Sequence, residues 1–240
     1  MVALYRDQGV VLRTIKLGET DRIVTMLTQG HGKVRAVAKG VRRPGSRFGA
    51  RLEPTGHVAV QLYQGRELDV VTQVETIDAN REVREHYGLL THAIAMLEAT
   101  DQVAQEREPN PALYRMVVGA LRTLAQAPES LVAPAFFWKL LALEGFEPML
   151  AICVQCGDDG GPFPVIDLGE GGVVCTSCSS FGGRRIRPDT LAALADLLNG
   201  GLARALNAPP PPEVVGELET LGIAALEWHF ERRLRSAALL

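Results

Sequence analysis

The spacing of apolar and polar positions divides the chain into two parts with different periods. Residues 1–80 hold five short runs rich in Val, Ile, Thr and Leu, separated by turns containing Gly, Asp or Pro. Such runs are typical of β-strands, and five short strands in so little chain predict a small closed or half-closed barrel. The predicted strands span 9–15, 22–28, 33–38, 57–63 and 68–74.

After Asp78 the apolar residues recur every three or four positions, which is the period of an α-helix. The positions that follow this period are Val83, Tyr87, Leu90, Ile94 and Leu97, then Leu113, Val117, Ala120 and Leu124. The segment 134–146 is apolar on nearly all sides and should be a central, buried helix. Further helices are predicted over 188–200, starting at Pro188, and in a last segment that carries apolar residues from Val214 to Leu234.

These patterns predict a multi-domain α+β chain. We expect a barrel domain over 1–80 and an all-α body over 81–240, with a cysteine-bearing insert at about 150–185. All four cysteines lie in two C-x-x-C pairs, Cys153 with Cys156 and Cys175 with Cys178, eighteen residues apart, and the stretch between them reads as a hairpin. This spacing is typical of a tetrahedral zinc site, and four thiolates fill the shell of a structural Zn²⁺. Disulfides and uncommitted thiols are the alternatives.

The charges are unevenly distributed. The chain has a formal net charge of -3, yet residues 1–80 contain twelve Lys and Arg against eight Asp and Glu. Within 32–52 seven cations occur without an acidic residue: Lys33, Arg35, Lys39, Arg42, Arg43, Arg47 and Arg51. We call 32–52 the basic segment. Its glycines permit close approach of a phosphate chain, and Arg forks match phosphate oxygens, so the segment predicts a nucleic-acid contact surface; a solvated face is the alternative.

Other chemistry is weakly indicated. Tyr5, Phe48 and Tyr63 could stack on bases or could simply pack in the barrel. No nucleophile, acid–base pair or nucleotide-binding loop has a recognisable spacing, so we expect no enzymatic activity. The N-terminal residues lack the pattern of a signal peptide, and no apolar run is long enough to cross a bilayer. We therefore expect a soluble cytoplasmic protein with no membrane partner.

The run GVVLRTIKLGETDRIVTMLTQGHGKVRAVAKGVRRPGSRFGARLEP closely resembles the opening of the bacterial RecO family of recombination mediators. The resemblance continues through LYRMVVGALRTLA, FFWKLLALEGFEPML, CVQCG and the second C-x-x-C. It implies an N-terminal OB-fold, a helical body with a zinc module, and no enzymatic activity. By the same resemblance the seven cations of the basic segment contact DNA.

The resemblance further implies binding of single- and double-stranded DNA and annealing of complementary strands. The expected protein partners are RecR, in some lineages RecF, and single-stranded-DNA-binding protein, with RecA loaded indirectly on gapped DNA in the nucleoid-associated cytoplasm. Two other classes remain open from the residues alone. One is a zinc-containing RNA- or ribosome-binding factor built on the same barrel, and the other is an interaction adaptor that binds no DNA.

Overall fold

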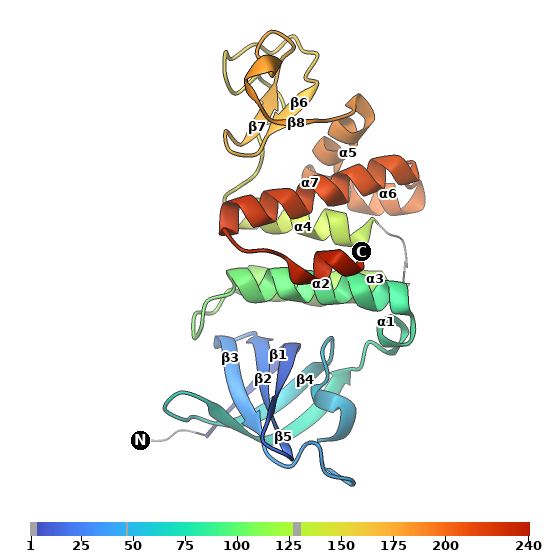
Figure 1. Cartoon of the computed structure of the whole chain (residues 1–240). Coiled ribbons are helices and arrows are strands. Elements are labelled where there is room, and N and C mark those ends of the chain that lie inside the picture. The colour runs from blue at the N-terminus through green and yellow to red at the C-terminus, as the bar shows by residue number, and fades with distance from the viewer. Residues whose placement is uncertain (1–3, 47, 127–130) are drawn as a thin grey trace. The chain divides into compact units, whose positions relative to one another are not determined.

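The computed structural model describes residues 4–46, 48–126 and 131–240 (Figure 1). These residues form two compact units, 4–126 together with Ala238–Leu240, and 131–237. The first unit holds strands β1 to β5, a short 3-10 helix η1 and helices α1 to α3. Their bounds are β1 Leu4–Leu17, β2 Asp21–Thr28, β3 Gly32–Ala38, η1 Gly49–Leu52, β4 His57–Tyr63, β5 Asp69–Asp78, α1 Arg81–Glu85, α2 Tyr87–Val103 and α3 Pro111–Gln126.

The five strands close into a barrel in the order β1-β2-β3-β5-β4, and β4 returns to pair with β1. Neighbouring strands are antiparallel except β3 and β5, which pair in parallel through Ala36 with Asp69 and Val37 with Val70. This is the five-stranded barrel of an OB-fold, and it confirms the expected fold class. β1 and β5 run beyond the predicted strands, because their outer ends are largely exposed and lack the apolar signal.

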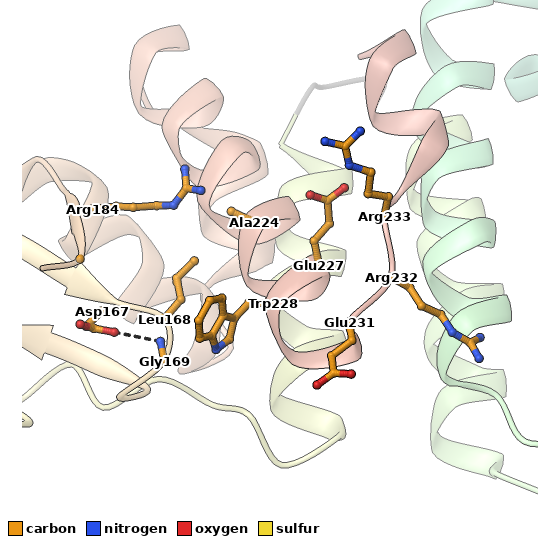
Figure 2. A pocket seen from close by; sticks show the side chains of 11 residues that line it. Asp167, Leu168, Gly169, Arg184, Ala224, Glu227, Trp228, Glu231, Arg232 and Arg233 are labelled. Atoms are coloured by element: carbon orange, nitrogen blue, oxygen red, sulfur yellow. Dashed lines mark hydrogen bonds between the residues drawn. The ribbon is translucent and has the colours of Figure 1, made fainter.

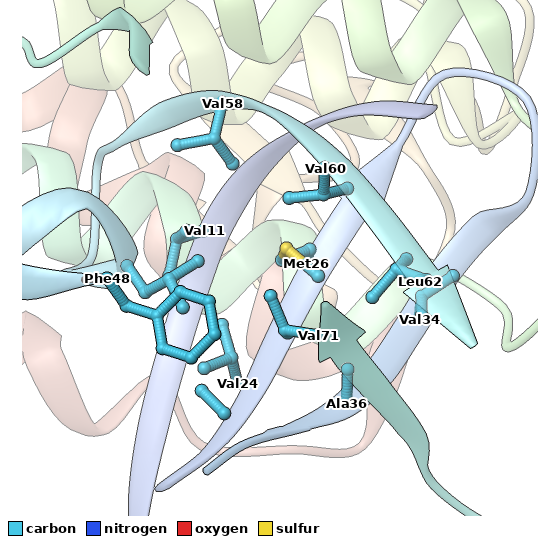
Figure 3. Packing of buried hydrophobic residues seen from close by; sticks show 12 residues of the cluster. Val11, Val24, Met26, Val34, Ala36, Phe48, Val58, Val60, Leu62 and Val71 are labelled. Carbon is cyan, nitrogen blue, oxygen red and sulfur yellow. The ribbon is translucent and has the colours of Figure 1, made fainter. Parts of the chain in front are cut away.

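The barrel interior is filled by the inward side chains of all five strands (Figure 3). Small branched residues dominate, with Met26 from β2 and Leu62 from β4 as the larger members. Phe48 enters from the connection after β3 and is only 3% exposed. The structure therefore gives Phe48 a packing role, and the idea that its ring stacks on bases was wrong.

Helices α2 and α3 pack against β1. Val10, Leu12 and Leu27 are buried although they are not part of the barrel core. An apolar run such as GVVL, which lacks strict alternation, is thus explained by burial on both faces of the strand. The helical period predicted for this segment is observed along α2. Tyr87, the first residue of α2, is an exception, because the period predicted an inward side chain and the residue is 73% exposed.

A fully buried carboxylate, Asp69, lies at the start of β5 where the barrel closes. It accepts hydrogen bonds from the Tyr5 hydroxyl, from Arg107 Nη2 at 2.6 Å and from the backbone N–H of Gly65 at 3.1 Å. Arg107 belongs to the connection between α2 and α3 and has a left-handed φ of 65°. Burial alone would raise the pKa of Asp69, but the bonds from Arg107, Tyr5 and Gly65 lower it below its ordinary value.

The second unit is built around α4, Val132–Leu143, in which every residue up to Trp138 is buried. The central buried helix predicted over 134–146 is thereby confirmed, with slightly different ends. Trp138 Nε1 donates to the carbonyl of Leu218 at 2.9 Å, and a Cβ on Gly222 would come within 3.1 Å of the same nitrogen. The remaining elements are β6 Val165–Asp167, β7 Gly172–Val174, η2 Ser179–Phe181, β8 Arg184–Arg185, α5 Pro188–Leu198, α6 Leu202–Asn207, α7 Pro212–Phe230 and, at the chain end, η3 Arg235–Leu239.

The last helix is shorter than the apolar spacing suggested. α7 ends at Phe230 because Glu231 takes a left-handed conformation with φ 51°. Leu234 is buried, as its apolar character implied, but from the segment that follows the helix rather than from the helix itself. Leu234 is therefore buried without being part of the helix.

Replacing Asp69 by Asn should destabilise the first unit by about 2–3 kcal/mol, because Arg107 and Tyr5 lose their charged acceptor inside the barrel. Since the pKa of Asp69 is lowered in the folded state, its contribution is present above the unfolded value of about 3.9 and is lost as the pH falls through the folded one. Urea unfolding at a series of pH values measures both effects. Hydrogen exchange of the backbone amides of β3 and β5 shows whether the loss lies at the barrel closure.

Glu67→Gln is the matched control, since Glu67 is an exposed carboxylate two residues away. The control should leave the free energy of unfolding within about 0.5 kcal/mol of the parent. Equal stability of the Asp69→Asn and Glu67→Gln variants would show that the buried carboxylate does not hold the barrel closed.

Candidate nucleic-acid interface and metal centre

The basic segment forms β3, the loop that follows it and η1. Along β3 the side chains of Val34, Ala36 and Ala38 point into the barrel core. Lys33 and Arg35 alternate with them and therefore lie on the outer face of the strand. The alternation expected for a half-buried strand is thus observed.

Lys33 and Arg35 are engaged with the end of α2 and the connection to α3. Lys33 Nζ lies 2.6 Å from the carbonyl oxygen of Asp101 and 3.4 Å from its Oδ1, and the Lys33 side chain is only 14% exposed. Arg35 Nη1 lies 3.7 Å from Glu106 Oε1. The backbone of Lys33 also accepts a bond from the N–H of Arg107 at 3.1 Å. These two cations fasten β3 to the α2–α3 connection.

Lys39, Arg42 and Arg43 lie on the exposed loop after β3. Arg42 Nη1 donates to the carbonyl oxygen of Glu19 at 2.8 Å, in the turn between β1 and β2. Asp21 accepts the N–H of Gly40 at 2.7 Å. That bond first, and then the Thr20 hydroxyl and the charges of Arg43 and Lys39, lower the pKa of Asp21. The loop is thereby pinned to the neighbouring turn while its cations face solvent.

Arg51, on η1, is also exposed, and Arg47 lies outside the described residues. The structure therefore brings Lys39, Arg42 and Arg43 together on one loop, with Arg51 beyond them on η1. Of the aromatic candidates, Tyr5 donates its hydroxyl to Asp69, and Tyr63 is 45% exposed at the end of β4.

A groove of about 580 Å³ in the second unit lies beside α7 and the hairpin of β6 and β7 (Figure 2). Its wall includes Trp228, whose side chain is 62% exposed. The charges around it balance, because its lining contains three arginines and three carboxylates. They are Arg184, Arg232 and Arg233 against Asp167, Glu227 and Glu231. With no net charge, the groove has little attraction for a phosphate chain.

The four cysteine sulfurs converge in the second unit. One Sγ from each of Cys153, Cys156, Cys175 and Cys178 lies within 4.8 Å of the others. Cys156 Sγ and Cys175 Sγ are 3.7 Å apart, and all four thiols are free of disulfides. A tetrahedral zinc site with bonds of about 2.3 Å places sulfurs roughly 3.8 Å apart, so the cluster fits such an ion.

Local backbone bonds shape each half of the cluster. The N–H of Gly157 bonds to the carbonyl of Cys153 at 2.8 Å, and Gly157 has a φ of 77° that favours glycine. β6 and β7 form the predicted hairpin, with Val165 opposite Val174. The hairpin brings the second pair of cysteines onto the first, and the N–H of Cys175 donates to Cys153 Sγ at 3.3 Å.

Without a metal the thiols of Cys153 and Cys178 differ widely in pKa. The N–H of Cys175, chief among several backbone donors, lowers the pKa of Cys153 to about 6. Hydrogen bonding with Cys156 and burial raise the pKa of Cys178 to about 12. A bound cation would displace the remaining protons, so metal affinity should rise with pH.

An OB-fold barrel with a basic loop, joined to a helical part that carries a four-cysteine cluster, defines a class of nucleic-acid-binding proteins with a metal module. Two family models then match the sequence. The N-terminal model of recombination protein O matches residues 1–80, and the C-terminal model matches residues 84–238. The chain belongs to the recombination protein O (RecO) family, which supports a role in DNA repair and recombination with DNA as a partner.

The sequence did not identify several residues that contact the basic segment or lie buried beside it. Asp101, Glu106 and Arg107 were not expected to meet β3, and Asp69 was not distinguished from an exposed acid. A helix–strand contact between distant residues leaves no local signal. Among the helices of the described chain, none has the length and apolar character required to span a membrane.

The protein should carry one zinc ion per chain when purified, and Cys153→Ser should lose it, because three thiolates bind zinc more weakly than four. The variant should also be cleaved faster within 150–185 in limited proteolysis, since metal binding stabilises the folded module. Metal analysis by mass spectrometry on the same sample gives the stoichiometry.

Ser177→Ala is the control, because Ser177 is exposed and lies between Cys175 and Cys178. It should keep both the metal and the protease resistance. A Cys153→Ser variant that retained one zinc and resisted protease like the control would exclude a four-thiolate structural site.

Proposed function

We propose that this chain binds single- and double-stranded DNA through the exposed part of the basic segment and anneals complementary strands. The barrel, 1–80, acts as the DNA-binding domain, and 81–240 forms the helical body with its zinc module. The observation that carries the proposal is the exposed loop after β3, on which Lys39, Arg42 and Arg43 gather and are followed by Arg51 on η1.

The proposed mechanism is electrostatic. The cations neutralise phosphates and release condensed counterions, which lowers the repulsion between two strands held near the same surface. Complementary bases then pair without any bond being made to the protein. Contacts with phosphates position a strand but do not read its sequence, so binding should depend little on sequence. No covalent step is required, which agrees with a non-enzymatic mediator.

Lys33 and Arg35 have a different part in this proposal. Their side chains are directed to Asp101 and Glu106, so they hold the α2–α3 connection on β3 and contribute to the local field only indirectly. Lys39 and Arg43 are the strongest candidates for direct contact, because they are exposed and lie on a loop held in place by Arg42.

Family membership supports further roles as proposals for this chain. Its protein partners are RecR, RecF in some lineages, and single-stranded-DNA-binding protein, and together they place RecA on gapped DNA. The cysteine cluster holds a structural Zn²⁺ through Cys153, Cys156, Cys175 and Cys178. The protein acts in the cytoplasm, at the nucleoid.

Binding of a single-stranded oligonucleotide should weaken steeply with salt. If four cations each neutralise a phosphate, affinity should fall by about 50-fold between 50 and 200 mM salt, with a logarithmic slope of about -3. Fluorescence anisotropy of a labelled DNA strand, repeated with an RNA hairpin of equal length, measures the slope and the preference. Salt-independent binding, or a clear preference for the RNA hairpin, would overturn the proposal.

Changing both Lys39 and Arg43 to Glu should lower DNA affinity by at least about tenfold and reduce annealing in parallel, because two phosphate contacts become repulsive. The matched control changes Arg6 and Arg115 to Glu. Both residues are exposed in the first unit, outside the basic segment, and the net charge changes equally. If both double variants anneal equally well, the loop is only a solvated surface.

A further inference from the structure

A hollow of about 400 Å³ in the first unit lies between η1, the end of β5 and α1. Three arginines line it, Arg51 from η1 and Arg81 and Arg84 from α1. Residues with little or no side chain, among them Gly49, Ala50 and Gly56, form much of the rest of its wall. A group in the hollow can thus contact both positively charged side chains and the protein backbone.

Among the residues that the structure describes, no carboxylate contributes to the lining of this hollow. Some acidic residues next to the lining in sequence belong to other hollows: Glu75 lines one on the barrel, and Asp78 lines one beside α1. Glu53 Oε1 lies 2.8 Å from Arg22 Nη1, and Glu82 lines the same hollow as Asp78, which Arg81 also lines. The groove beside Trp228 therefore differs from this hollow, whose described lining contains three arginines and no carboxylate.

The positions of Arg81 and Arg84 are fixed by the start of α1. Asn80, which precedes the helix, is buried with a left-handed φ of 43°, and its Nδ2 donates to the carbonyl of Thr55 at 2.8 Å. Arg81 and Arg84 are three residues apart, so they share one face of α1. Arg84 Nη1 also lies 3.5 Å from the carbonyl of Ala50, which brings the helix onto η1.

At Gly56 the wall of the hollow cannot accept a larger residue. A Cβ on Gly56 would lie 2.8 Å from the carbonyl oxygen of Arg51, closer than real Cβ contacts. A group inside the hollow therefore meets main chain at Gly56 as well as the arginine side chains.

We propose that this hollow binds a phosphate of the nucleic-acid strand whose neighbouring phosphates contact the loop after β3. Guanidinium forks match phosphate oxygens with paired hydrogen bonds. Arg51 ends the basic segment and also lines the hollow, so the strand continues from the barrel loop onto α1. The inference rests on the proposed function and adds Arg81 and Arg84, which are not in the basic segment, to the DNA path.

The test changes Arg81 and Arg84 to Gln together. Loss of the one phosphate held in the hollow should reduce the logarithmic salt slope of single-strand binding by about 0.7. The affinity at low salt should fall correspondingly. A double change of Arg6 and Arg115 to Gln, which removes the same charge from exposed positions of the first unit, should leave the slope unchanged. Thermal unfolding of each variant confirms that the first unit remains folded.

The outcomes separate this inference from the function on which it rests. If the unmodified chain shows no salt-dependent DNA binding, the proposed function fails. If it binds and the Arg81/Arg84 variant keeps the slope of the control, the inference alone fails. If inorganic phosphate at constant ionic strength stabilises the parent and not the variant, while their DNA slopes agree, the hollow is a site for a free anion, and the inference also fails.

Discussion

Closure of the barrel depends on one buried carboxylate. β3 and β5 are joined by only two paired positions, Ala36 with Asp69 and Val37 with Val70. Asp69 supplies what this short pairing lacks, because it holds β1 through Tyr5 and the α2–α3 connection through Arg107. Without Arg107 the interior would contain a charge without its cationic partner, at a cost of several kcal/mol. The strained φ of Arg107 persists because this carboxylate holds its side chain.

The same arrangement decides which cations are available for a ligand. In many OB-folds the face of strands two and three binds the ligand directly. Here the α2–α3 connection approaches that face, and Lys33 and Arg35 are used to hold it. The proposed contact surface therefore consists of the loop that follows β3, together with η1, and not of the face of β3. The contacts that hold the α2–α3 connection on β3 therefore also decide which cations of the basic segment stay exposed.

Local patterns predicted the barrel strands, the central helix and the cysteine cluster because each depends on residues close in sequence or on a spacing specific to metal. Local patterns could not predict which cations are bonded within the protein and which are exposed. Lys33 and Lys39 look alike in sequence, yet one is bonded to Asp101 and the other is exposed. Phe48 was equally ambiguous, since only the fold shows that its ring completes the core. The expectation for Leu234 failed because a tertiary contact buries it beyond the end of the helix.

Both tryptophans of the chain lie in the second unit, and their surroundings differ strongly. Trp138 is enclosed between α4 and α7, whereas Trp228 is largely open to water. Intrinsic tryptophan emission therefore reports only on the unit that holds the cysteine cluster, with one blue-shifted and one red-shifted component. The first unit contains no tryptophan. All four tyrosines lie in the first unit, so tyrosine emission reports on that unit, and selective excitation of tryptophan follows the helical unit alone.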